Sequence, residues 1–490
     1  MKGSICGRGY GLVRVISAVI ILLAISAPVF SAKVTLSPDN WGLEEGRACI
    51  DCHEKSSPGL THQWRESAHA DANVNCLDCH HADAVDDDAM EHEGSIIATI
   101  VSPRDCARCH EAEYRESEGS VHSKALVKLE KKFPNLNDRV FGEEMTAAGC
   151  TQCHGSKIRV KGDGTLDPDT WPNSGIGRIN PDGSRGSCSA CHGRHGFSKA
   201  QARTPAACIR CHSGPESPDG EVYNSSQHGI MYSAHRDKMN LDSDEWVTGK
   251  DYSAAPTCVT CHMGAAPGLN ATHDVGMRDA WRLNGPVSEK QYLVIFQDGD
   301  RRDLPASHAA PRRGTQLSRL DGSVGKVKAV ATPGRRRKAM RRVCLECHSK
   351  GFAKGFMRQF DTVVKRYNEK YGKPAQAIMN ALYEKKVLSP APFDEPLEFS
   401  YWRLWHDEGT RARHGAAMGS PNSTWWEGMH LVAQNFYGTF LPLVRKTAGE
   451  ELGNALIDQF VSGQDHHSWL RKSTQSNPGL GYGIGIPGDE

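Results

Sequence analysis

The clearest hydrophobic periodicity lies in the last third of the chain. Apolar residues recur there at intervals of three and four, as in Phe356, Phe360, Val363, Val364 and Tyr367. This spacing predicts an amphipathic helix. Pro374 predicts the start of a second helix, and residues 399–417 and 425–448 predict two more. We therefore expect residues 353–490 to form a helical region that serves oligomerisation.

The rest of the chain lacks such periodicity. Residues 33–284 predict short helices and long loops, and residues 285–343, rich in Arg, Gly and Pro, predict an irregular segment. An apolar run from Val15 to Phe30 follows a basic start and ends at the small residues Ser31 and Ala32. This pattern predicts a signal peptide over residues 1–32. An uncleaved anchor is the alternative, but the run is shorter than the roughly 20 residues of a membrane span.

Composition adds the decisive feature. With 59 basic and 58 acidic residues, the chain gives no reason to expect nucleic acid as a partner. It has 17 Cys and 23 His, and every Cys except Cys6 falls in a repeated Cys-x-x-Cys-His motif. The eight motifs are Cys49–Cys52–His53, Cys76–Cys79–His80, Cys106–Cys109–His110, Cys150–Cys153–His154, Cys188–Cys191–His192, Cys208–Cys211–His212, Cys258–Cys261–His262 and Cys344–Cys347–His348.

This motif predicts covalent attachment of c-type haem. Its two thiols can form thioethers to one porphyrin, and the adjacent histidine can bind the iron from below. A zinc site needs four ligands and gives no reason for a histidine after every pair. We therefore predict eight haems (Fe), with a core built largely from porphyrin, in an exported protein. The basic stretch 301–342 either offsets the haem propionates or forms a solvated face.

Fifteen histidines remain as candidates for the opposite side of each iron. Seven are our candidates for this role, chosen from their contexts and partly from the family resemblance given below: His69, His92, His122, His195, His228, His273 and His414. We expect the others to be surface or packing residues: His62, His81, His235, His308, His406, His430, His466 and His467. His81, which follows His80, is the least secure of these exclusions. Seven candidates for eight irons predict one open iron.

The chain resembles the octahaem hydroxylamine oxidoreductase family. The resemblance rests on the motif spacing and on linking phrases: Glu91-His92-Glu93-Gly94, residues 101–106, residues 171–173, residues 180–183, Cys261-His262-Met263-Gly264, residues 272–276 and Arg413-His414-Gly415-Ala416. It implies a mainly α multihaem cytochrome c fold, with a loop-rich haem-packed N-terminal part and long C-terminal helices. It also implies a trimer, and a five-coordinate catalytic haem on Cys150, Cys153 and His154.

Two departures from the family pattern bear on the chemistry. Oxidative members carry a haem-crosslinking tyrosine in a Pro-Asp-Tyr-Thr phrase, where this chain has Pro421-Asn422-Ser423-Thr424. The absence of this tyrosine implies a reductive member. The family phrase Gly-Pro-Asp-His-Pro, whose Asp and His handle protons, reads Gly214-Pro215-Glu216-Ser217-Pro218 here. Glu216 and Ser217 are the predicted pocket residues, without the imidazole best suited to proton transfer near neutral pH.

The resulting prediction is a periplasmic oxidoreductase with residues 33–352 as its octahaem domain. It would reduce nitrite, to nitric oxide or on to ammonium, and/or hydroxylamine. Its electrons would come from a partner cytochrome or a quinol-linked protein, and it would form a homotrimer or a complex with a small cytochrome. Oxidation of hydroxylamine or hydrazine is one alternative, and a non-catalytic electron-transfer or scaffold subunit is another. Trp402, Trp405, Trp425 and Trp426 could pack on haems, on a partner, or in a helix core.

Overall fold

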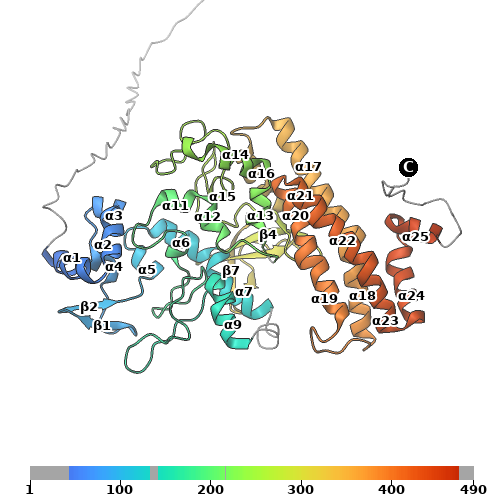
Figure 1. The fold of residues 1–490 in the computed structure, drawn as a ribbon, viewed down its shortest axis with the longest axis horizontal. Coiled ribbons are helices and arrows are strands. Elements are labelled where there is room, and N and C mark those ends of the chain that lie inside the picture. The colour runs from blue at the N-terminus through green and yellow to red at the C-terminus, as the bar shows by residue number, and fades with distance from the viewer. Residues whose placement is uncertain (1–43, 133–141, 216, 474–490) are drawn as a thin grey trace, which may run out of the picture.

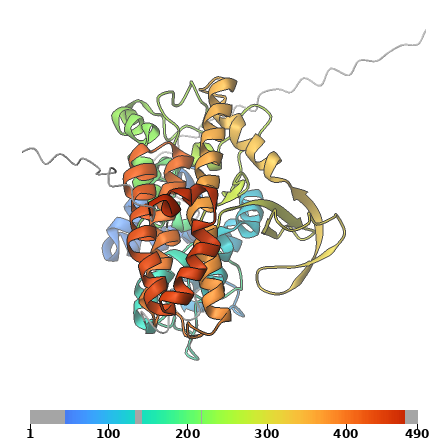
Figure 2. The same ribbon diagram turned by 90° about the vertical axis from the view of Figure 1, so that its right-hand side faces the viewer.

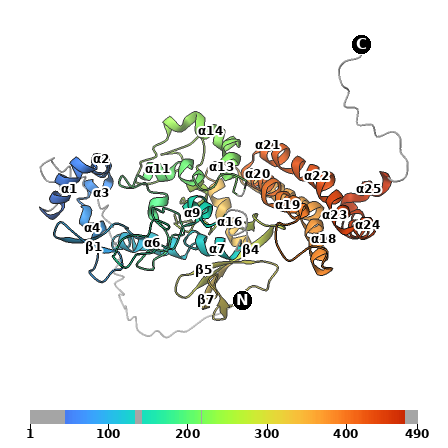
Figure 3. The ribbon, with the colours of Figure 1, turned by 60° about the horizontal axis from the view of Figure 1, so that its bottom comes forward.

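The computed structural model describes residues 44–132, 142–215 and 217–473 (Figure 1). The predicted signal peptide, Glu216 and the end of the chain lie outside these ranges. Short helices at one end of the molecule and long helices at the other give it an elongated shape (Figures 1 and 3). Within the described ranges, no helix combines the length and the apolar character that crossing a membrane requires. The mainly α fold is confirmed.

The first part of the chain consists of short helices joined by long loops. They are α1 (Glu44–Ser56), α2 (Pro58–Arg65), α3 (Ala68–Asp71), α4 (Cys76–His80), α5 (Pro103–Cys106), α6 (Glu111–Gly119), α7 (Ala125–Lys132), α9 (Gly142–Ala148), α10 (Cys150–His154), α11 (Lys199–Arg203), α12 (Pro205–Ile209), α13 (Asp219–Asn224), α14 (Gln227–His235) and α15 (Cys258–His262). A hairpin of β1 (Ala89–His92) and β2 (Ser95–Ala98) lies among them. Its turn uses Glu93 and Gly94, both at positive φ, which suits a two-residue hairpin.

The prediction of an irregular segment over residues 285–343 is wrong. It contributes four strands, β4 (Glu289–Phe296), β5 (Arg301–Pro305), β6 (Gln316–Ser318) and β7 (Val324–Ala331), to an antiparallel sheet that begins with β3 (Trp281–Arg282). The sheet is followed by α16 (Pro333–Cys344). The sheet projects from the side of the molecule (Figure 2). Its two tight turns contain Asp298-Gly299 and Asp321-Gly322, a strong hairpin signal that the abundance of Arg and Lys masked. On β7, Val327 is buried between the exposed Lys326 and Lys328, as a half-buried strand requires.

Part of the basic stretch 301–342 is internal structure rather than a solvated face. Arg336 is buried, and its guanidinium binds Asp303 Oδ1 at 2.7 Å and the carbonyl oxygens of Gly276 and Gln291. Arg301 donates to Glu116 O at 2.9 Å and pairs with Asp274 at 3.2 Å. These two arginines therefore attach the sheet to the loops that carry the motifs.

The C-terminal region consists of three long helical stretches and two shorter helices. The elements are α17 (Lys350–Tyr367), α18 (Lys373–Glu384), α19 (Pro396–Trp402), α20 (Gly409–Met418), α21 (Pro421–Thr424), α22 (Leu431–Asn435), α23 (Leu441–Ala448), α24 (Glu450–Ile457) and α25 (Ser468–Ser473). Wide π-helical turns join several of them, so that 350–384, 396–418 and 421–448 are each continuous. Pro374 therefore does not open a separate helix. It follows a π turn that accommodates its missing N–H and its ring.

The C-terminal helices enclose a conventional apolar core. Tyr367, Ile378, Leu382, Leu397 and Phe436 lie among its buried members. A smaller cluster lies on the sheet. Within the described residues, both hydrophobic clusters lie beyond residue 284. The region that carries the first seven motifs therefore needs something other than a cluster of apolar side chains to fill its interior.

The four tryptophans named from the sequence divide into two pairs. Trp405 belongs to the helical core, and Trp402 packs against that core. Trp425 and Trp426 are more than half exposed. Trp402 and Trp405 are therefore part of the helix core, as one of the interpretations predicted. Contact of Trp425 and Trp426 with a partner stays a prediction.

Candidate haem and catalytic sites

Local helix geometry gives three of the motifs the shape that haem attachment requires. In α4, α10 and α15 the motif is one helical turn, so its two cysteines lie on one face and the histidine extends beyond them. Asn75 and Asp78 form a capping box that starts α4, and Ser102 and Asp105 form another that starts α5. No disulfide joins the motif cysteines, and the described residues contain no group of three His, Cys, Asp or Glu suited to a metal ion.

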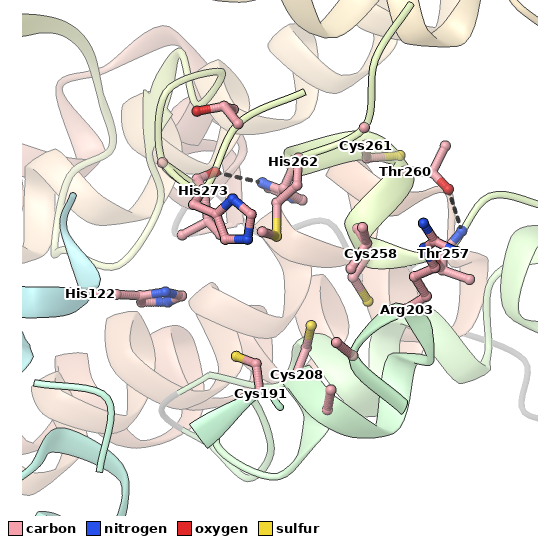
Figure 4. A pocket seen from close by; sticks show the side chains of 18 of the residues that line it. His122, Cys191, Arg203, Cys208, Thr257, Cys258, Thr260, Cys261, His262 and His273 are labelled. Carbon is pink, nitrogen blue, oxygen red and sulfur yellow. Dashed lines mark hydrogen bonds between the residues drawn. The ribbon is translucent and has the colours of Figure 1, made fainter. Parts of the chain in front are cut away.

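The motifs surround a large internal space. A cavity of about 3200 Å³ is lined by all three residues of each motif from the third to the eighth, and by Cys79 of the second. Ordinary ligand pockets measure roughly 300–1,000 Å³. Figure 4 shows Cys191, Cys208 and Cys258 pointing into one part of this space, with His122 and His273 facing it from other segments. Such a space, walled by paired thiols and imidazoles, fits covalently bound macrocycles.

Several motif histidines are held in one tautomer. Nδ1 lies 2.8 Å from Ala98 O in His80, 3.2 Å from Ala125 O in His154 and 3.2 Å from Val275 O in His262. Nδ1 of His212 lies 2.8 Å from a carboxylate oxygen of Asp219. Nδ1 therefore acts as the donor, which leaves Nε2 to bind a metal, as is usual for metal-binding histidines.

Five of the predicted distal histidines each face a motif histidine. The ring centres are separated by 6.1 Å for His53–His92, 6.2 Å for His69–His110, 6.3 Å for His80–His195, 6.1 Å for His122–His212 and 6.1 Å for His228–His348. An iron between two imidazoles needs a bond of about 2 Å on each side, which accounts for a separation of this size. The structure therefore brings together partners that are far apart in sequence, although iron binding itself stays a prediction.

The protonation state of these histidines also suits a metal ligand. Burial, followed by the facing motif histidine, lowers the pKa of His69, His195 and His228, and it lowers the pKa of His122 to about 3. Burial and then His273 lower the pKa of His192, which makes His273 the neighbour of the fifth motif. Ligating imidazoles must be neutral, so this environment prepares them for the role.

His414 behaves differently from the other six candidates. Its Nδ1 lies 2.5 Å from Asp219 Oδ1, and its Nε2 lies 2.9 Å from Asn284 Oδ1. Both nitrogens are therefore occupied, which speaks against the prediction that His414 binds an iron. Among the described residues, no imidazole faces His154, His192 or His262 in a ring pair like the five above, although His192 has His273 as a neighbour.

Asp219 is a site residue that sequence reasoning missed. Its two oxygens bind His212 and His414, so one carboxylate joins two imidazoles. Burial alone would raise the pKa of Asp219, but the two imidazoles hold it well below its ordinary value. Burial likewise opposes the charge on His212, yet hydrogen bonding to Asp219 raises the pKa of His212. The sequence signal was an acidic residue seven positions after a motif histidine, but His414 is too distant in sequence to be linked with it.

The predicted catalytic residues are only partly brought together. His154 lines the cavity. The Ser217 hydroxyl lies 3.2 Å from His212 Nδ1 and 3.2 Å from Asp219 Oδ2. Ser217 therefore lies beside His212 of the sixth motif and forms a hydrogen bond with Asp219. It does not lie beside His154. Glu216 lies outside the described residues.

Close backbone packing fixes the position of the fourth motif. Gly155 has φ +92°, and a Cβ there would lie 2.2 Å from the backbone nitrogen of Arg178. Gly175 and Gly177 contact the same motif just as closely. Asn173 donates from Nδ2 to Thr151 O at 2.9 Å. The segment that begins at the Trp171-Pro172-Asn173 phrase thus holds the helix that carries His154.

Ser423, which the resemblance predicts in place of the crosslinking tyrosine, lies inside the subunit. It is fully buried, and its hydroxyl lies 3.3 Å from Ser225 Oγ and 3.5 Å from Glu427 Oε2. Gly415 and Gly428 pack so closely against the backbone of Ser423 that a Cβ at either position would clash with it. A side chain of this size does not extend from the surface of the subunit.

Contacts between cysteines of different motifs reveal how the motifs follow one another in space. Cys49 lies beside Cys76, Cys106 beside Cys188, Cys208 beside Cys258 and Cys153 beside Cys211. Electrostatic contacts link Cys79 with Cys106, Cys191 with Cys208 and Cys261 with Cys344. The spatial order is therefore first, second, third, fifth and sixth. The fourth and the seventh both adjoin the sixth, and the eighth adjoins the seventh.

Comparison with known proteins agrees with this geometry. A family model described as "Seven times multi-haem cytochrome CxxCH" matches residues 179–290, and "Cytochrome c554 and c-prime" matches residues 105–193. A probable nitrite reductase-hydroxylamine oxidoreductase fusion protein of Kuenenia stuttgartiensis is 28% identical over 385 residues. The match covers 71% of this chain but only 39% of that protein.

Two solved structures share the fold. A hypothetical multiheme protein superposes with a TM-score of 0.69 and 23% identity, covering 84% of this chain and 97% of that chain. A reducing HAO-like protein complex of Kuenenia stuttgartiensis gives a TM-score of 0.56 and 21% identity, covering 84% of this chain and 87% of that chain. At these identities the likeness concerns the fold.

The motifs, the facing imidazoles and the family matches define a class: this chain is a multihaem c-type cytochrome that binds haem covalently. Within that class its sequence is similar to part of the probable nitrite reductase-hydroxylamine oxidoreductase fusion protein of Kuenenia stuttgartiensis.

Proposed function

We propose that this chain is a periplasmic octahaem cytochrome that reduces nitrite, hydroxylamine or both. The proposed site is the haem on Cys150, Cys153 and His154. A haem bound there would supply an iron that can bind the nitrogen compound and a route for electrons. The count of eight haems is supported by eight motifs, six of which line the cavity with both thiols and the imidazole.

The observation that carries the proposal is the contrast between His154 and its neighbours. The histidines of the third and sixth motifs each face a second imidazole, whereas His154 does not. His262 lacks a facing imidazole as well, but the resemblance implies catalysis at the fourth motif. Cys153 of this motif lies beside Cys211 of the sixth motif, so electrons could reach a haem there from the haem of the sixth motif.

The chain's own residues would position the haem and control protons. Ala125 O fixes the tautomer of His154, and the glycine contacts with the 175–178 segment hold its helix. Glu216 would polarise the bound substrate. Ser217 and Asp219 would act through His212, because a carboxylate on Nδ1 raises the basicity of the iron-bound imidazole.

The reductive direction is favoured by Ser423. A buried serine has neither the ring nor the reach to crosslink with a haem of a neighbouring subunit. The oxidation of hydroxylamine or hydrazine, which the resemblance links to that crosslink, is the second candidate. The relative named a probable nitrite reductase-hydroxylamine oxidoreductase fusion protein makes both reactions relevant. The electron partner, the trimer or hetero-oligomer and the periplasmic location belong to the same proposal.

Carbon monoxide tests for the open iron. The reduced protein should bind it, and the double variant Cys150→Ser/Cys153→Ser, which keeps the other motifs, should lose the band assigned to the fourth haem. The matched variant Cys49→Ser/Cys52→Ser, at the far end of the series, should keep that band while mass spectrometry shows one haem fewer. Absence of carbon monoxide binding in the intact protein would leave only the electron-transfer role.

Steady-state assays then decide the direction. With reduced methyl viologen as donor, the intact protein should consume nitrite or hydroxylamine, and the fourth-motif variant should not. Faster oxidation of hydroxylamine with an electron acceptor than reduction with the donor would favour the second candidate.

A further inference from the structure

The eighth motif ends the haem series at the protein surface. Its only cysteine contact with another motif is to Cys261 of the seventh, within the described residues. Cys347 is exposed, and the flanking Leu345 and Phe352 are 40% and 58% exposed. An end position that reaches the surface is where an electron can pass to or from another protein.

Apolar side chains next to this site are exposed on both axial sides. The Phe352 ring stacks on His348 at 4.5 Å and an interplanar angle of 14°. On the other side, Met231 lies three residues after His228 on α14 and is 38% exposed. Both side chains also line the haem cavity. A protein that docks here would therefore contact groups directly adjacent to the haem.

Basic residues without a carboxylate partner lie on the two helices that flank the eighth motif. Lys338 and Arg341 lie on α16, and Lys350 and Lys354 lie on α17. None of the four forms an ion pair with a described carboxylate, unlike Arg337, which pairs with Asp361. Residues 338–354 contain a single acidic residue, Glu346. We call Met231, Lys338, Arg341, Lys350, Phe352 and Lys354 the eighth-haem collar.

The opposite end of the series has the opposite charge. Residues 83–93 contain Asp83, Asp86, Asp87, Asp88, Glu91 and Glu93 and no Lys or Arg. This stretch includes His92, which faces His53 of the first motif. Charge of opposite sign at the two ends steers differently charged partners to different haems.

We propose that the eighth-haem collar is the docking site for an acidic one-electron carrier protein. The collar offers a small apolar centre with a cationic rim, which fits a carrier with acidic residues around its own exposed redox group. In each encounter one electron passes from the reduced carrier, which is oxidised, to the cytochrome, which is reduced. The inference rests on the proposed reductive function for the direction of transfer.

The test uses reduced plant-type ferredoxin as the acidic donor and the whole haem-loaded protein as the acceptor. The collar variant is Lys338→Glu/Arg341→Glu/Lys350→Glu/Lys354→Glu. The matched control carries four reversals on the projecting sheet: Arg312→Glu/Arg313→Glu/Lys326→Glu/Lys328→Glu. Seven of the eight positions are exposed and Arg341 is half-buried, and none of the control positions forms an ion pair with a described carboxylate. Reduction is followed by stopped flow at increasing ionic strength.

The rate constant for wild type should fall as salt rises, and the collar variant should be slower by about 10-fold or more at low salt. The sheet variant should stay within about twofold of wild type. Methyl viologen radical, which needs no docking, should reduce all three proteins at one rate. This donor also separates the two proposals, because loss of nitrite and hydroxylamine turnover with it would refute the function and leave docking intact.

Three results would overturn the inference. The first is an equal loss in the collar and sheet variants. The second is a shifted potential of one haem in the collar variant together with salt-independent reduction of wild type, since the collar would then only neutralise propionates. The third is a change of oligomeric state in the collar variant alone, measured by light scattering, since the surface would then bind a second copy of this chain.

Discussion

The region of the motifs and the C-terminal helices fill their interiors in different ways. Residues 44–284 consist of helices of 4 to 13 residues around a cavity of about 3200 Å³. Residues 350–473 contain continuous helices that bury Ile378, Leu382 and Phe436 in a side-chain core. Ordering a chain costs about 1–2 kcal/mol per residue, which a folded region must offset by burial. The helical region has this burial in its own side chains, whereas the motif region depends on haem.

Preventing haem attachment should therefore have the largest effect on folding. It should unfold the motif region and leave the C-terminal helices folded. Expressed without haem-attachment machinery, the chain should be cleaved by protease throughout residues 44–284, while a helical fragment that contains residues 350–462 survives. The physical reason is that the cavity would otherwise remain without contacts across it. Limited proteolysis with mass spectrometry measures this. Equal protection of both regions would refute the contrast.

A truncation in the helical core should lower stability without changing haem content. Phe436 is fully buried and its ring lies 5.4 Å from that of Tyr371, so Phe436→Ala should cost about 3–5 kcal/mol. Denaturant unfolding followed by circular dichroism gives the free energy, and the haem absorbance per protein gives the content. The control Trp426→Ala removes a side chain that is 61% exposed and should change stability by less than about 0.5 kcal/mol. Haem loss in the first variant would show that the two regions fold as one.

A methyl group at the fourth motif should act locally. Gly155→Ala places a Cβ against Arg178 and retains a positive φ, at a cost of about 1–3 kcal/mol or more. We expect weaker carbon monoxide binding at the fourth haem and unchanged spectra of the others. Gly162→Ala, where a Cβ meets nothing within 4 Å, is the matched control. Equal effects of the two substitutions would contradict the role assigned to this packing.

Removal of the Asp219 charge should have the smallest effect and appear as a redox change. Asp219→Asn weakens the acceptor on His212 Nδ1, so the sixth haem should take up electrons at a more positive potential. Loss of a buried hydrogen-bonded charge should also cost about 1–3 kcal/mol. Spectroelectrochemistry measures the first effect. Ser217→Ala, which removes only a hydroxyl 3.2 Å from Asp219, should leave the potentials unchanged.

The same residue makes a prediction about pH. Because the pKa of Asp219 is lowered on folding, its stabilisation is complete above the ordinary pKa of an aspartate, about 3.9. It is lost as the pH falls further, through the lowered value. Acid unfolding below about pH 4 should therefore be shallower in Asp219→Asn than in wild type. If stability fell equally with decreasing pH in the two proteins, Asp219 would not be ionised in the folded state.

The local parts of the site were predictable, and the long-range parts only in some cases. Histidines beside motifs, such as His69 and His92, were recognised from short phrases, and each faces a motif histidine. His414 was selected in the same manner, yet its nitrogens contact Asp219 and Asn284. The strands of residues 289–331 were missed because a basic exposed face concealed their alternation. Local sequence carries periodicity, but it does not show which distant side chain meets a given nitrogen.

The sequence by itself determined the cofactor class and the helical nature of the last third. Thioether formation needs only two cysteines one turn apart with a following histidine, and helix periodicity repeats within a few residues. The tertiary structure decided the pairing of imidazoles, the order of the motifs in space and the place of Asp219 between His212 and His414. These features depend on how loops pack around one cavity. Residues that touch there are far apart in the sequence, and their separation along the chain does not indicate which of them meet.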